Sequence, residues 1–129
     1  MTSMNQYETK QSDTGVEMQV YDPDGEPIKG AKIKLLGKDS QVHKKIDFKR
    51  QQSAIDRMAK GKKAFGLKAE TLNEQSLDDL AELTLDMGNL EIDKKKIGSD
   101  KALIRETYKR FPFLAEQARE FIENRANFL

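Results

Sequence analysis

The C-terminal stretch from Asp100 to Leu129, DKALIRETYKRFPFLAEQAREFIENRANFL, holds the densest apolar pattern of the chain. Apolar residues recur at helical spacing on both sides of Pro112: Leu103, Ile104, Tyr108 and Phe111 before it, and Leu114, Ala118, Phe121 and Ile122 after it. Proline lacks a backbone N–H and disfavours helix for the residue before it, but fits the first turn of a following helix. The stretch therefore predicts two helices that meet at Pro112, with Ser99 or Asp100 as the first cap.

Near the N-terminus the apolar period changes from helical to alternating. Residues at every second position are apolar in two runs, which are Val16, Met18 and Val20, and then Ala31, Ile33 and Leu35. The turn sequence Asp22-Pro23-Asp24-Gly25 separates them. We predict a β-hairpin over residues 15–37, which needs a third strand, another layer or a second copy to cover it. The polar residues 1–14 are predicted to be a disordered leader.

The middle of the chain predicts two helices of opposite charge. A basic helix over residues 41–60, capped by Asp39 or Ser40, has only a thin apolar stripe, so one narrow side can be buried. A basic connector between Gly61 and Gly66 follows it. The sequence Thr71-Leu-Asn-Glu74 fits a capping box for an acidic helix that ends near Gly88. Residues 89–98 are predicted to be a linker.

Together these elements predict a single α+β domain over residues 15–129, with the hairpin first and about four α-helices in residues 38–129.

The composition excludes several classes of protein. Among 129 residues, 36% are hydrophobic and 35% are charged, which indicates a thin core with much solvated helix surface. The chain has no cysteine and therefore neither disulfides nor a thiolate metal site. No apolar run is long enough to span a membrane and no signal-peptide core is present, so we expect a soluble protein without a membrane partner.

No pattern in the sequence supports catalysis. His43 is the only histidine, and a solvated helical residue is the favoured interpretation of it over a metal ligand. The carboxylates Asp78, Asp79 and Glu82 are explained by the solvated face of a helix. Phosphate-binding loops, dinucleotide fingerprints and nucleophile elbows are absent from the sequence. We therefore predict a protein that is not an enzyme and has no catalytic, metal or cofactor site.

Charge is strongly segregated along the chain. Residues 29–68 hold thirteen Lys or Arg against three Asp, whereas residues 69–93 hold eight Asp or Glu and no Lys or Arg. The basic block could neutralise phosphates, in which case binding would be salt-dependent. It has few aromatic residues, only Phe48 and Phe65, and the acidic block offsets its charge. Nucleic acid binding is thus the minority interpretation, and solvation of a surface helix explains the lysines equally well.

The C-terminal stretch holds more aromatic residues than two short helices can bury between themselves. They are Tyr108, Phe111, Phe113, Phe121 and Phe128. Most of them are expected in the core, and one or two are expected to contact another chain.

The same stretch carries a resemblance to a known family. The run Tyr108-Lys-Arg-Phe-Pro-Phe-Leu-Ala-Glu-Gln-Ala118 and the ending Phe121-Ile-Glu-Asn-Arg-Ala-Asn-Phe-Leu129 are similar to the C-terminus of tail assembly chaperones from long-tailed bacteriophages and prophages. The N-terminal hairpin followed by Gly37-Lys-Asp-Ser40 and a basic helix is a weaker similarity. A tryptophan that often precedes the final helices in that family is missing, because residues 86–90 read DMGNL and the chain has no Trp.

The resemblance implies a function that composition alone does not. Such chaperones bind the helical tape measure protein, keep it soluble and promote assembly of the tail tube protein around it in the host cytoplasm, without remaining in the mature virion. Further expected partners are a longer frameshifted form of the chain and other copies of itself. As partner-binding candidates we take residues of the C-terminal helix pair, namely Tyr108, Phe111, Phe113, Leu114, Phe121 and Phe128. Two alternatives stay open: a minor tail or tail-completion protein, and a small nucleic-acid-binding regulator.

Overall fold

A computed structural model describes residues 1–60 and 69–129 of the chain. It has a mixed α+β fold, as predicted, with a small antiparallel sheet near the N-terminus and helices after it. The predicted basic connector after Gly61 lies outside the described residues. In chain order the elements are η1 (Met4–Tyr7), α1 (Gln11–Thr14), β1 (Val16–Tyr21), β2 (Pro27–Leu35), α2 (Gln41–Ala59), α3 (Ala69–Leu83), β3 (Thr84–Asp86), β4 (Glu91–Ile92), β5 (Lys95–Lys96), α4 (Lys101–Arg110), α5 (Pro112–Glu123) and η2 (Arg125–Phe128).

The predicted hairpin forms and gains a third strand. Strands β1 and β2 pair antiparallel, with Met18 opposite Ile33. One face of the pair is buried and consists of Met18, Val20, Ala31, Ile33 and Leu35. In the turn between them, Gly25 adopts φ +89° and donates its N–H to the Asp22 carbonyl at 2.9 Å. Strand β3 pairs with the other side of β2, so the strand order is β1-β2-β3. This pairing provides the additional strand that the hairpin requires.

Three sequence predictions about residues 71–98 were wrong. The acidic helix ends at Leu83 and not near Gly88, since Thr84–Asp86 leaves the helix to pair with β2. Residues expected to form a plain linker instead contain the hairpin β4–β5, whose turn holds Asp93 and Lys94 at positive φ. Thr71 also lies inside α3, which begins by Ala69, and not at its cap.

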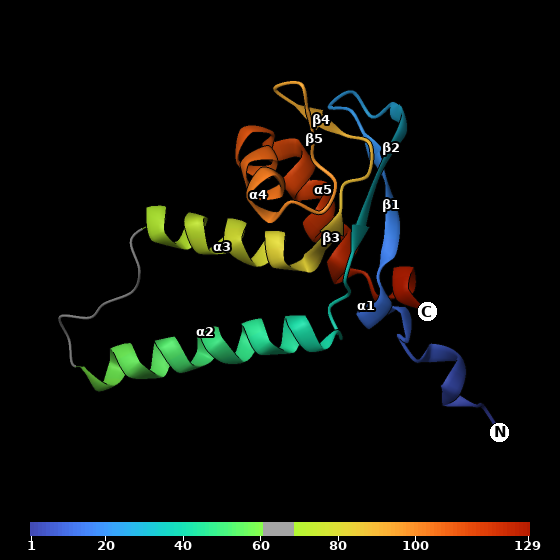
Figure 1. The fold of residues 1–129 in the computed structure, drawn as a ribbon. Coiled ribbons are helices and arrows are strands. Elements are labelled where there is room, and N and C mark those ends of the chain that lie inside the picture. Colours follow the sequence, from blue (N-terminus) through green and yellow to red (C-terminus); the bar gives the residue numbers. More distant parts are fainter. Residues whose placement is uncertain (61–68) are drawn as a thin grey trace.

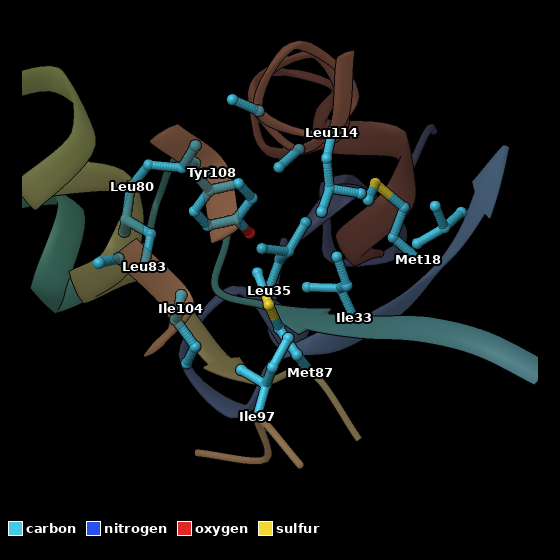
Figure 2. Packing of buried hydrophobic residues seen from close by; sticks show 14 of the residues in the cluster. Met18, Ile33, Leu35, Leu80, Leu83, Met87, Ile97, Ile104, Tyr108 and Leu114 are labelled. Atoms are coloured by element: carbon cyan, nitrogen blue, oxygen red, sulfur yellow. The ribbon is translucent and has the colours of Figure 1, made fainter. Parts of the chain in front are cut away.

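The helix pair at Pro112 forms as predicted. Asp100 caps α4 by accepting hydrogen bonds from the N–H groups of Ala102 and Leu103, and Pro112 occupies the first turn of α5. Figure 2 shows Tyr108 beside the leucines of α3, and Leu114 over the sheet beside Met18. The Tyr108 hydroxyl lies 2.7 Å from Thr84 Oγ1, which donates to the Leu80 carbonyl. The C-terminal helices, α3 and the sheet thus share one core.

Part of the segment expected as a disordered leader contacts the domain. Helix α1 lies within it, and Ser12 is buried. The Thr9 hydroxyl donates to Asp39, and the Gln11 side chain donates to the terminal Leu129 carbonyl. These partners are far along the chain, so the polar composition of residues 1–14 did not indicate them. From Thr9 onward the segment has a defined place between Asp39 and the C-terminus.

Candidate docking surface

Among the long helices that the structure describes, α2 is the one least covered by the rest of the fold. Figure 1 shows it running beside α3 and extending away from the sheet. It begins at Gln41, where Ser40 accepts a hydrogen bond from the His43 N–H, as the sequence predicts. None of its 19 residues is buried. A helix of five turns that has only half-buried and exposed residues derives less of its stability from tertiary packing than a helix with a buried face.

An ion pair attaches α2 to α3 near the middle of both helices. Arg50 donates from Nε and Nη2 to the two carboxylate oxygens of Asp79, at 3.1 and 2.5 Å. Both side chains are about a quarter exposed. The hydrogen bonds that Arg50 donates to Asp79 raise the pKa of Arg50 above its ordinary value, against the opposing effect of burial. This two-pronged geometry fixes the relative rotation of the helices.

Hollows lie on both sides of this ion pair. The first, of about 520 Å³, is bounded by α2, α3 and α5, and its apolar wall consists of Leu72, Leu80, Leu83 and Ile122. The second, of about 910 Å³, is bounded by α2, α3 and α4 and includes Val42 and Ile46. We call the two together the interhelical groove. The groove exists because the inner face of α2 carries polar residues such as Arg50, Ser53 and Arg57, which leave space where large apolar side chains would fill it.

The face of α2 turned away from α3 carries large apolar side chains. Phe48, Ile55 and Met58 are 68%, 58% and 81% exposed. They are seven and three residues apart, so they follow one another along a single side of the helix. We call these three residues the outer row. The sequence did not indicate the outer row, because the apolar residues of this helix were all expected on its narrow buried side. In the structure only Val42 and Ile46 of the helix pack against the core.

The partner-binding candidates at the C-terminus divide into two groups. Tyr108, Leu114 and Phe128 are buried to 4% exposure or less, because they fill the space between the sheet and the helices. In this conformation they are core residues and have no surface to offer a partner. Phe111 is 39% exposed, while Phe113 and Phe121 are half-buried. Phe111 packs edge-on against Phe113, and Phe121 packs edge-on against Phe128.

A charged network joins α4 to α3. Arg105 is ion-paired with Asp78 at 2.6 Å and also with Glu74. Lys101 donates to the Ala81 carbonyl at 2.9 Å and to that of Thr84, so its ammonium group lies at the C-terminal end of α3. These contacts occupy the acidic face of α3 from within the same chain. Three carboxylates of the acidic block, Glu74, Asp78 and Asp79, therefore attach α3 to neighbouring helices.

Comparison of the chain with protein-family models, with curated proteins and with solved structures gave no match. Within residues 1–60 and 69–129, every helix is too short or too polar to cross a lipid bilayer. Within the same residues, no three His, Cys, Asp or Glu side chains lie together in a group that could hold a metal ion. The described residues offer a partner apolar and charged surfaces on helices.

Proposed function

We propose that the protein is a tail assembly chaperone of a long-tailed bacteriophage or prophage, which binds the helical tape measure protein and keeps it soluble until the tail tube forms around it. The assignment to this family is supported by the resemblance of residues 108–129 to the C-terminus of tail assembly chaperones. The proposed binding of a helical client is supported by physical features of the protein surface. In the proposed function the protein acts in the host cell before the particle is complete.

The observation that supports the proposal most is the helix α2, which buries none of its residues and exposes Phe48, Ile55 and Met58. Large apolar side chains gathered on one exposed surface are a common feature of protein-binding sites. A helical client with apolar rows of its own can be covered by such a surface through helix-in-groove docking. Because no residue of α2 is buried, we expect that its surface can adapt to a client and release it without disrupting the core.

The C-terminal candidates have a different role in this proposal. Since Tyr108, Leu114 and Phe128 form part of the core, their contribution is to hold the fold together. Phe111 and Phe113 remain as candidate client contacts because part of each ring stays accessible. The client-binding surface is thus expected mainly on α2, with the loop around Pro112 as a secondary contact.

Co-expression with the tape measure protein of the same phage or prophage tests the function. We expect the client to stay in the soluble fraction and to co-purify with the full chain, and to aggregate when expressed alone. The variant Phe111→Ser with Phe113→Ser tests the secondary contact in the same assay. Tyr7→Ser is the control, because Tyr7 is an exposed aromatic residue of η1, outside α4 and α5. A client that is equally soluble without the chain, or that never co-purifies with it, would contradict the proposed function.

A further inference from the structure

The outer row of α2 has a charge pattern that selects among partners. We propose that Phe48, Ile55 and Met58 dock an amphipathic helix whose apolar stripe is flanked by acidic residues. The identity of the client as a tape measure segment rests on the proposed function, but the docking chemistry does not.

The row has the geometry of one side of a helix–helix interface. Seven residues separate Phe48 from Ile55, and Met58 follows three residues later, which is the a, a, d spacing of a heptad pattern. The side chains therefore form a seam along about three turns of α2. A seam of this shape fits the apolar stripe of another helix better than it fits a flat surface or a small molecule.

Lysines border the N-terminal half of the row. By helical geometry, Lys44 lies on one side of Phe48, and Lys45 and Lys49 lie on the other. Lys45 and Lys49 thus stand between the outer row and the second hollow of the interhelical groove, which they also line. All three side chains are exposed, and within residues 1–60 and 69–129 no carboxylate lies within 4.0 Å of their ammonium groups. Carboxylates that flank the stripe of a docked helix would meet these ammonium groups, whereas a basic helix would be repelled.

A second copy of the chain fits the row poorly. Pairing α2 with α2 would bring the same lysines together. The only strongly acidic helix in the described chain is α3, and its apolar residues Leu77 and Leu80 are already buried in the core. Its carboxylates Asp78 and Asp79 are paired with Arg105 and Arg50 of the same chain. Of the leucines of α3, only Leu72 is largely exposed. Within residues 1–60 and 69–129, no acidic helix therefore offers this row a continuous apolar stripe, and a foreign acidic helix is the favoured occupant.

Peptide binding to the full chain tests the inference. The probes are fluorescently labelled helical peptides of one length with the same leucine stripe, flanked by glutamate, by glutamine or by lysine, together with a glutamate peptide whose leucines are scrambled off the stripe. We expect the striped glutamate peptide to bind at least about tenfold more tightly than the lysine and scrambled peptides in fluorescence anisotropy. Its advantage over the glutamine peptide should shrink as the salt concentration rises, because salt screens exposed charges.

Two substitutions localise the site. Phe48→Ser and Ile55→Ser should each weaken binding of the striped glutamate peptide by about tenfold or more, since each removes a large apolar contact. Ile28→Ser is the matched control, because Ile28 is an exposed isoleucine on β2. Circular dichroism and thermal unfolding should be unchanged for all three variants. Lys45→Gln with Lys49→Gln should reduce the preference for glutamate over glutamine flanks.

Four outcomes would overturn the inference. The first is equal binding of the striped glutamate and lysine peptides, and the second is unchanged binding of the striped glutamate peptide to the Phe48→Ser and Ile55→Ser variants. The third is tighter binding of a labelled DNA oligonucleotide than of the acidic peptide. The fourth is a concentration-dependent dimer that Phe48→Ser abolishes. A tape measure protein that remains soluble and bound with the Phe48→Ser/Ile55→Ser chain would overturn this site while leaving the proposed function intact. Conversely, acidic-peptide binding without any effect on the tape measure protein would retain the site and contradict the function.

Discussion

Helices α2 and α5 of this protein contain comparable large apolar residues but use them in opposite ways. In α5, Leu114, Ala115, Ala118 and Ile122 are all buried against the sheet and the other helices. In α2 no residue is buried, and three large apolar side chains face outward. The difference shows that apolar content does not by itself determine burial. What matters is whether the apolar side of a helix faces the core.

The largest effect on stability is expected for a matched pair of phenylalanines, one from α2 and one from η2, the short helix that follows α5. Phe128 is fully buried and Phe48 is 68% exposed. Phe128→Ala should lower the free energy of unfolding by about 3–5 kcal/mol, because it removes a buried ring and leaves a cavity. Phe48→Ala should change it by less than about 0.5 kcal/mol. Urea unfolding of both variants measures the contrast, and equal losses would show that α2 is as well packed as the C-terminus.

A smaller effect on global stability is expected at the attachment of α2. Arg50→Met breaks the ion pair with Asp79. We expect a loss of about 1 kcal/mol or less in global stability, because the pair is only partly buried. Amide hydrogen exchange in α2 should accelerate, while exchange in α5 should stay close to that of the unmodified chain. Lys49→Met is the control from the same helix. Unchanged exchange in α2 would mean that contacts other than this ion pair hold the helix in place.

The smallest expected effect concerns the contact between the start of α2 and the C-terminus. The hydrogen bond from Arg125, followed by that from Thr9, holds the pKa of Asp39 below its ordinary value of 3.8. Between the lowered pKa and 3.8 the unfolded chain binds more protons at this residue than the folded chain does. The stability that Asp39 contributes is therefore present above pH 3.8 and is lost as the pH falls through the lowered pKa.

Asp39→Asn removes this titration, so we expect the variant to be slightly less stable near neutral pH and to lose less stability on acidification. Urea unfolding midpoints measured from neutral to acidic pH give both quantities. Asp24→Asn in the β1–β2 turn provides a control carboxylate outside the contact. A pH profile for Asp39→Asn that parallels the unmodified chain would show that the Arg125 contact does not influence folding.

Local signals in the sequence predicted the helices and the hairpin well. Ser40 and Asp100 cap their helices, Pro112 separates α4 from α5, and the alternation around the Asp22–Gly25 turn gives the observed pairing of β1 with β2. Each of these features depends on residues close to one another in the chain. The candidate site was less predictable: of the six C-terminal candidates, three proved to be core residues, and the outer row of α2 was not anticipated.

The sequence by itself determined the type and approximate bounds of most elements, since caps, prolines, turns and periodicity act over a few residues. Only the tertiary structure decided that Thr84–Asp86 leaves α3 to join the sheet, that residues 9–14 pack near the C-terminus, and that Tyr108 and Phe128 are buried while Phe48 is exposed. These outcomes depend on contacts between elements that are tens of residues apart in the sequence. Local patterns show that a side chain is apolar, but the packing of distant elements decides whether anything covers it.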